Sequence, residues 1–143
     1  MISTLEKTIY LKSSSVFAGI PAENLSKLAA IAAESSWASG TVVFREGDPG
    51  DALYVVLSGA VRIVKGDIEI ATMTKHACFG DMAVLDGAPR SAHAIVSEDA
   101  MLLRITSEEF FDVLAENPEL VQGVIRLLTG RLREANARIG VES

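Results

Sequence analysis

The sequence predicts a mainly β protein, an antiparallel β-barrel or sandwich with helices before and after it. Short apolar or β-branched runs follow one another from residue 41 to 105 and are separated by Gly, Asp, Ser and Pro. Such close spacing favours antiparallel strands over βαβ units. Apolar residues at helical spacing occur mainly outside this stretch. The 143 residues and 49% hydrophobic content are enough for one domain with a substantial core.

Two helices are expected ahead of the strands. Ser3 and Glu6 have the spacing of a capping box, which predicts a helix to about Ser13 with Leu5 and Ile9 on one face. Pro21 is placed to open a second helix. We therefore divide this region into a first helix with its connector, residues 1–15, and a helical segment, residues 16–36.

The β region is expected at residues 37–106. Six strands are predicted, at residues 41–44, 53–57, 61–64, 68–73, 93–96 and 101–105, with turns at 47–50, 58–59 and 66–67. Residues 80–85 break the alternation and suit one helical turn.

Residues 107–143 are expected to be helical. Ser107 is predicted to cap a helix to about Ala115, and Asn117 precedes a long helix that reaches about Ile139. A stripe at spacings of three and four runs along this last helix: Ile125, Leu128, Leu132, Ala135 and Ile139. It fits packing on the barrel and dimerisation equally well.

Composition excludes several classes. A net charge of -6 argues against a nucleic-acid surface. The single cysteine, Cys78, excludes an intramolecular disulfide framework and is expected to be a buried thiol in a reducing cytoplasm. No apolar run approaches the roughly 20 residues of a spanning helix. With His76 and His93 as the only histidines and no third ligand evident, we expect no metal site. No Ser-His-Asp or paired-carboxylate arrangement can be argued, so we expect no enzyme.

Residues 79–92, F-G-D-M-A-V-L-D-G-A-P-R-S-A, carry the strongest functional signal. An arginine, Arg90, brought next to a helix start inside a small barrel would make a phosphate pocket. The alternative is that Arg90 pairs with Asp81 or Asp86 and closes a surface turn, which is common for arginine near carboxylates. Spacing alone favours neither.

The same stretch closely resembles the phosphate-binding cassette of cyclic nucleotide-binding domains, whose pattern is F-G-E, a few small or apolar residues, then P-R-S/T-A. Residues 46–59 resemble the family's glycine-marked hairpin, and 117–120 resemble the start of its C-terminal helix. The resemblance covers about residues 16–139. It implies a jelly roll (double-stranded β-helix) that forms one domain over residues 1–143, and a cyclic mononucleotide as ligand with no other cofactor.

The resemblance also implies a role for each site residue. Arg90 and Ser91 would bind the cyclic phosphate, together with the amides of Gly80, Met82 and Ala83. Asp81 would accept a hydrogen bond from the ribose 2′-hydroxyl, although the family's usual residue is the longer glutamate. An apolar wall would surround the sugar and base: Ile63, Ile70, Met73, Phe79 and Ala92. Arg131 and Asn136 match positions from which relatives reach the base.

These residues imply a regulatory domain that senses cAMP or cGMP and moves its C-terminal helix to control an attached or partner effector. Ser91 weakly favours cAMP as the ligand, because in relatives a threonine at this position helps to favour cGMP. No room remains after the last helix for a DNA reader, so we expect no direct DNA binding. The short apolar runs lead us to expect no membrane insertion. The alternative is a barrel that no longer binds nucleotide and serves as an interaction or homodimerisation module. A metal-dependent barrel enzyme would instead hold stoichiometric metal.

Overall fold

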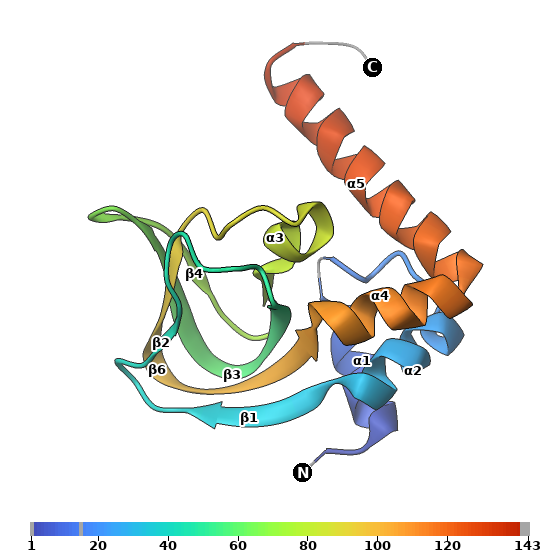
Figure 1. Ribbon diagram of the computed structural model, residues 1–143, viewed down its shortest axis with the longest axis horizontal. Helices are drawn as coiled ribbons and strands as arrows, with labels where there is room; N and C mark the ends of the chain where they lie inside the picture. The colour runs from blue at the N-terminus through green and yellow to red at the C-terminus, as the bar shows by residue number, and fades with distance from the viewer. Residues whose placement is uncertain (1, 15, 141–143) are drawn as a thin grey trace.

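The computed structural model describes residues 2–14 and 16–140. Helices α1 (Thr4–Ser13) and α2 (Ala22–Ile31) lead into strands β1 (Ala33–Trp37), β2 (Val42–Phe44), β3 (Ala52–Lys65), β4 (Ile68–Met73) and β5 (Cys78–Phe79). The short helix α3 (Asp81–Asp86) precedes β6 (His93–Thr106), and helices α4 (Ser107–Glu116) and α5 (Pro118–Arg138) end the described chain. Figure 1 shows the helices α1, α2 and α4 gathered at one end of the strands.

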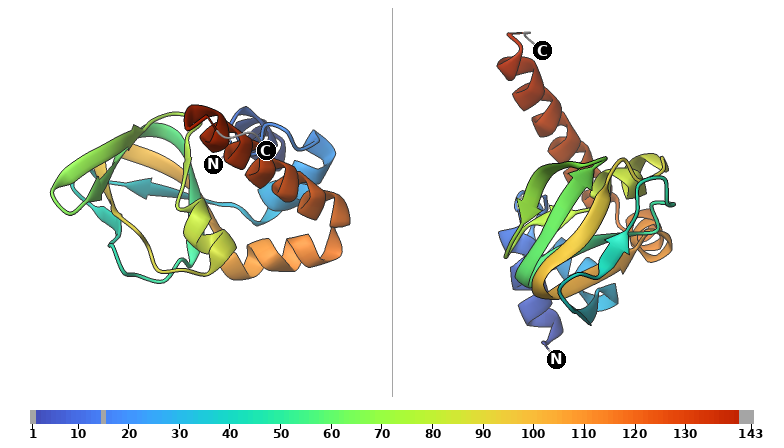
Figure 2. Two further views of the ribbon diagram at one scale, coloured as in Figure 1. Left: turned by 90° about the horizontal axis from the view of Figure 1, so that it is seen from above. Right: turned by 90° about the vertical axis from the view of Figure 1, so that its left-hand side faces the viewer.

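All strand pairs are antiparallel and belong to one sheet, in the order β1-β6-β3-β4, with β2 also on β6 and β5 also on β3. The sheet curls on itself, as the two views of Figure 2 show. The predicted antiparallel β architecture with flanking helices is confirmed. The barrel is not closed, however, because no pairing joins the outer strands β1 and β4 in the described part of the chain.

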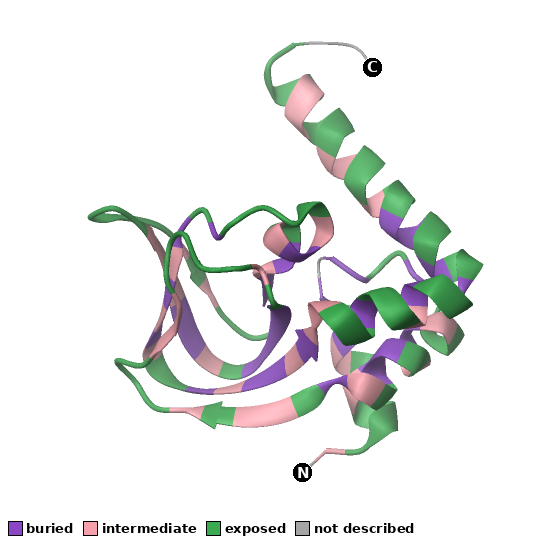
Figure 3. Ribbon diagram, viewed as in Figure 1, coloured by how far each residue is buried: buried purple, intermediate pink, exposed green. Residues whose placement is uncertain are grey.

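β3 is buried on both faces over its first six residues, which explains the apolar run from Ala52 to Leu57. Along most of β6, buried residues alternate with half-buried ones, and Glu98 and Asp99 are exposed. Successive side chains of a strand point to opposite faces. Leu53, Val55 and Leu57 accordingly pack with the helices in one core. Tyr54 and Val56 pack inside the curl of the sheet in a second core. Figure 3 shows the buried colour running along both strands.

The strands differ from the sequence prediction in continuity. β1 and the short β5 were not predicted, and two pairs of expected strands are single strands, β3 and β6. Gly59 explains why β3 continues through its Ser-Gly pair. It adopts a φ of +83°, and a Cβ there would collide with the backbone of Asp99 and Ala100 on β6. The Ser58-Gly59 pair, which the sequence predicts as a turn, therefore lies inside β3 at a point where β3 and β6 come very close.

The N-caps of α1 and α4 can be compared with the caps that the sequence predicts. The predicted capping box of α1 is confirmed, with Ser3 Oγ accepting from Glu6 N at 3.1 Å. The predicted cap of α4 is wrong by one residue. Thr106, not Ser107, accepts from Glu109 N, at 3.2 Å.

Helix α5 packs against the rest of the chain at its start and then projects away from it (Figures 1 and 2). It lies close to residues 16–20 at Gly123, where a Cβ would lie 2.8 Å from Cγ1 of Ile20. Ile125 and Leu132 of α5 are 58% and 60% exposed, and Figure 3 shows much of this helix in the exposed colour. None of the helices in the described residues is long and apolar enough to cross a membrane.

Candidate functional site

A cavity of about 290 Å³ opens inside the curled sheet, between β4, β5, the cassette helix α3 and one residue of α5. It is lined by Phe44, Ile63, Met73, Cys78, Phe79, Gly80, Asp81, Met82, Ala83, Arg90, Ser91, Ala92 and Arg131. A larger cavity of about 580 Å³ lies between α5 and residues 16–20. We assign the site to the smaller one because it contains the buried charges of Arg90 and Asp81.

Arg90 is only 3% exposed and is held mainly by backbone oxygens. Its Nη1 donates to Gly80 O at 2.7 Å and its Nη2 donates to Ala52 O at 2.5 Å. Burial lowers the pKa of the guanidinium from its usual value, while Tyr54 and Asp51 act to raise it. Its Nε is buried and has no hydrogen-bond partner among the described residues. The alternative, in which Arg90 closes a surface turn with Asp81 or Asp86, does not fit this buried position and these partners.

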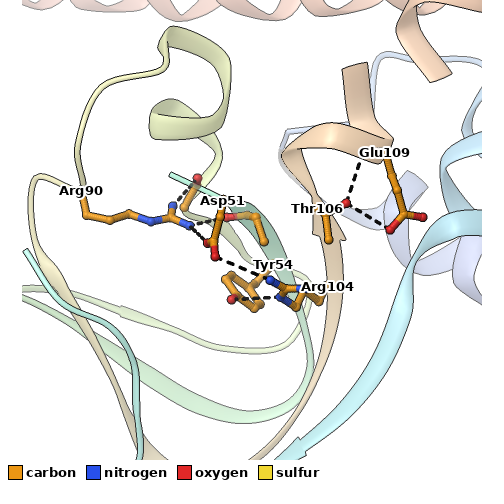
Figure 4. A network of polar contacts seen from close by, with 8 residues as sticks. Asp51, Tyr54, Arg90, Arg104, Thr106 and Glu109 are labelled. Atoms are coloured by element: carbon orange, nitrogen blue, oxygen red, sulfur yellow. Dashed lines mark hydrogen bonds and ion pairs between the residues drawn. The ribbon is translucent and has the colours of Figure 1, made fainter. Parts of the chain in front are cut away.

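The carboxylate that does reach Arg90 belongs to Asp51, at the start of β3 (Figure 4). Asp51 Oδ1 lies 3.5 Å from Nη2 of Arg90, and Oδ2 lies 3.7 Å from Nη2 of Arg104. Arg104 also donates from Nε to the hydroxyl of Tyr54 at 3.4 Å. This chain of contacts joins the cassette to β3 and β6, so the side chain of Arg90 is fixed to the centre of the sheet.

Asp81, the cassette acid, is 7% exposed and is paired with α5. Its Oδ2 accepts from Nη1 of Arg131 at 3.0 Å, and the same Nη1 lies 3.1 Å from the sulfur of Met82. In this structure Arg131 thus contacts the cassette itself. This ion pair directly connects the cavity to helix α5.

The apolar side of the cavity consists of Ile63 from β3, Met73 from β4 and Phe79 from β5, with Phe44 and Cys78 beside them. Sequence reasoning did not assign Phe44 or Cys78 to the site. Cys78 is buried, as predicted, and burial is the main cause that raises the pKa of its thiol well above the usual value.

Two residues expected at the site do not line this cavity. Ile70 is 58% exposed. The pairing of β3 with β4 skips it, because Ile63 lies opposite Ala71 and Val64 lies opposite Glu69, and such an irregularity re-aims the side chain. Asn136 is five residues beyond Arg131 on α5, which turns it by about 140° from the direction of Arg131. Helix periodicity could have separated Asn136 from Arg131 in the sequence, whereas the irregular strand pairing at Ile70 has no such signal.

The chemistry of the site is that of recognition. A buried cation, a buried carboxylate and an apolar wall can bind a small anion that carries hydroxyl and apolar parts. No group of three or more His, Cys, Asp or Glu side chains in the described residues is arranged to hold a metal ion.

The fold and site together define a ligand-binding β domain of the jelly-roll type. The sequence profile of the cyclic nucleotide-binding domain matches residues 34–117. The chain therefore belongs to the cyclic nucleotide-binding domain family.

Curated relatives and solved structures agree with this assignment. The chain is 30% identical over 138 residues to the cyclic AMP receptor protein of Thermus thermophilus, covering 93% of this chain and 64% of that protein. It is 31% identical over 140 residues to glutaminase 1 of Bradyrhizobium diazoefficiens, covering 94% of this chain and 23% of that protein. The crystal structure of the N-terminal domain of a transcriptional regulator from Streptomyces coelicolor superimposes with a TM-score of 0.82 at 28% identity, covering 94% of this chain and 98% of the other. The chain thus spans less than two thirds of the length of the Thermus and Bradyrhizobium relatives.

Proposed function

We propose that this chain senses a cyclic mononucleotide, cAMP or cGMP, in the cavity inside the sheet. The observation that carries the proposal is Arg90, a nearly fully buried cation at the cavity wall whose Nε lacks an acceptor. A buried donor left unpaired is costly, and more so on a charged group. A cyclic phosphate supplies both an acceptor and the opposite charge, and Ser91 at the same wall can add a hydroxyl donor.

Asp81 is proposed to bind the ribose. A carboxylate has two oxygens with two acceptor positions each, so Oδ1 can accept from the 2′-hydroxyl while Oδ2 keeps Arg131. Asp81 is about 1.5 Å shorter than the family's glutamate. The sugar must therefore lie closer to α3, or a water must bridge the two groups.

The output is proposed to be a change in the position of α5. Arg131 and Asp81 are 50 positions apart in sequence, and their contact ties α5 to the ligand cavity. A ligand that interacts with Asp81 differently when Arg131 is near or far must shift the equilibrium between two positions of α5. By linkage, the position of α5 must change the affinity for the ligand equally. An effector attached to α5, or a partner protein bound to it, would be controlled in this way.

We propose cAMP as the preferred ligand. Ser91 lacks the methyl group of threonine, the residue that we associate with cGMP preference at this position. The relative from Thermus thermophilus is named for cyclic AMP.

Calorimetric titration with cAMP, with cGMP and with the non-cyclic 5′-AMP tests the function. The protein is first unfolded and refolded, so that nucleotide carried over from the cell is removed. We expect one-to-one binding of a cyclic nucleotide at micromolar or tighter affinity, and much weaker binding of 5′-AMP. No heat and no competition at millimolar cAMP or cGMP would refute the proposal.

Amide hydrogen exchange with and without nucleotide tests the coupling. We expect exchange in α5 to change on binding, and the change to diminish in Arg131→Gln. Arg133→Gln is the matched control, because Arg133 lies on the same helix, is exposed and does not line the cavity. Identical exchange of α5 in both states of the wild-type protein would refute the output through this helix.

A second candidate function is homodimerisation through α5. Its outer stripe, Val121, Ile125, Leu128, Leu132 and Ile139, is 36–73% exposed and repeats at alternating spacings of four and three up to Leu132. That spacing is the seam of a two-stranded coiled coil. Sedimentation equilibrium should show a dimer that Leu132→Glu dissociates, whereas a wild-type monomer at hundreds of micromolar would exclude it.

A further inference from the structure

Phe44 and Arg90 form the closest contact between a cation and a ring at the site. The guanidinium carbon of Arg90 lies 4.0 Å from the centroid of the Phe44 ring. The ring is itself held in an aromatic cluster, with centroids 6.3 Å from Tyr54 and 6.1 Å from Phe79. The surface on which the guanidinium lies is therefore fixed from behind.

A local irregularity of the sheet brings the ring there. β2 pairs with β6 through Val42 opposite Ile95 and Phe44 opposite Ala94, so the register shifts by one residue between the two pairs. A bulge of this kind bends the strand and re-aims the side chains that follow it. Phe44 is the last residue of β2 and follows the shift directly.

Gly80 closes the other approach to the same guanidinium. Its carbonyl oxygen accepts from Nη1 of Arg90 at 2.7 Å. A Cβ on Gly80 would lie 2.7 Å from that Nη1 and 3.3 Å from Cε2 of Phe44. The ring, the arginine and the glycine thus form one packed unit with no room for a further carbon.

The physical effect of such stacking depends on burial. A guanidinium over an aromatic face is attracted by the ring quadrupole, more strongly where water is excluded. Because the guanidinium is planar, a ring beneath it restricts its tilt as well as its position, which suits two-point binding of phosphate oxygens. Arg90 is buried, so both effects act at close to full strength.

We propose that Phe44 is a positioning residue for the ligand's phosphate, holding the Arg90 guanidinium in the plane from which it binds. This rests on the proposed function, because Arg90 is taken as the phosphate-binding residue. Phe44 also lines the cavity, so its role must be separated from direct contact with the nucleotide.

Cyclic AMP titrations of variants provide the test. Phe44→Leu keeps apolar bulk but removes the ring, and we expect it to weaken cAMP binding about three- to thirtyfold, or roughly 0.7–2 kcal/mol. Phe44→Tyr keeps the ring face and should stay within about threefold of wild type. Phe79→Leu is the matched control, since Phe79 belongs to the same cavity and aromatic cluster but is not placed over Arg90.

A double-mutant cycle separates positioning from contact with the ligand. In an Arg90→Lys background, the effect of Phe44→Leu should shrink to less than about twofold, while that of Phe79→Leu should persist. Equal effects of Phe44→Leu in both backgrounds would mean that the ring acts on the ligand directly, and would overturn the proposal.

A spectroscopic readout needs no ligand. The Nε–H resonance of Arg90, assigned by its loss in Arg90→Lys, should be shielded by the ring and exchange slowly with water in the free protein. It should move downfield and exchange faster in Phe44→Leu, and by clearly more than in Phe79→Leu, which removes only a support of the Phe44 ring. A resonance unmoved by Phe44→Leu would refute positioning. Failure of the wild-type protein to bind cAMP or cGMP would contradict the proposed function. Wild-type binding with unchanged binding by Phe44→Leu would contradict only the role of Phe44.

Discussion

Asp51 and Arg90 are 3.5 Å apart but differ sharply in exposure, because the side chain of Asp51 is 65% exposed and that of Arg90 is 2% exposed. The carboxylate stays solvated whether or not the pair forms, whereas the guanidinium has already lost its water. The two partners therefore cannot be equally important for stability.

Removing the exposed partner should cost little. Asp51→Asn is expected to lower the free energy of unfolding by less than about 1 kcal/mol, as for other exposed ion pairs. The difference from wild type should shrink as salt is raised from 0.05 to 0.5 M, because salt screens exposed charges. Urea unfolding at both salt concentrations measures it, and a large loss that salt does not change would contradict the exposure argument.

Removing the buried partner should affect both folding and binding. Arg90→Ala leaves the carbonyls of Gly80 and Ala52 without their donors, so we expect a loss of about 1–3 kcal/mol in the free energy of unfolding. Binding of cAMP should weaken at least tenfold to a hundredfold, since each 1.4 kcal/mol is a factor of ten. Urea unfolding and calorimetry measure the two effects. Arg45→Ala, which removes an exposed arginine that does not line the cavity, should change neither.

Two glycines of the cassette separate backbone strain from crowding. Gly80 and Gly87 both have positive φ, +78° and +70°, but only at Gly80 would a Cβ meet Arg90. Gly87→Ala is expected to cost about 1 kcal/mol of stability from backbone strain alone. Gly80→Ala should cost more and should also weaken cAMP binding, because the guanidinium must move. Equal stability losses with equal affinities would show that the space around Arg90 is not tight.

Two glycines of α5 should respond with opposite signs. Alanine is favoured over glycine in a helix by about 0.8–1 kcal/mol. Gly130→Ala adds a Cβ with no neighbour within 4 Å and should raise the melting temperature. Gly123→Ala places its Cβ 2.8 Å from Ile20 and should lower it by forcing α5 away from residues 16–20. A stabilising Gly123→Ala would mean that this contact yields easily.

The rate at which Cys78 is alkylated should depend on pH and on whether the cavity holds a ligand. Burial raises the pKa of its thiol, so alkylation by iodoacetamide should be slow at pH 8 and still be accelerating above pH 9. Above the ordinary thiol pKa of about 8.5 the unfolded chain ionises first, so this residue's contribution to stability is full below that pH and falls above it. Cyclic AMP should slow alkylation further, since Cys78 lines the cavity. Alkylation at the rate of a free thiol would contradict the burial.

Much of the fold follows from local signals in the sequence. The capping box at Ser3 and the turn at residues 66–67 predict α1 and the β3–β4 hairpin, and both are confirmed. The missed strand β1 has the sequence Ala-Glu-Ser-Ser-Trp, which has little β propensity and is held by pairing with β6 instead. That the predicted barrel stays open is equally invisible in the sequence, because it depends on the curl of the whole sheet.

The candidate site was predicted best where a contiguous motif carries it. All the cassette residues assigned to the site line one cavity, as do Ile63, Met73 and Arg131. What sequence could not supply were contacts between distant segments. Three contacts of the site join residues more than 35 positions apart in the sequence: Asp81 with Arg131, Asp51 with Arg90, and Phe44 with Arg90.

The two faces of β3 pack in two different cores, and this affects how the protein unfolds. Because Leu53 and Tyr54 are neighbours in the chain but belong to different cores, separating β3 from β6 would expose both cores at once. The helical end and the cavity end should therefore melt in a single transition. A ligand bound only inside the sheet would then protect distant α2 from heat as effectively as it protects the strands that touch it.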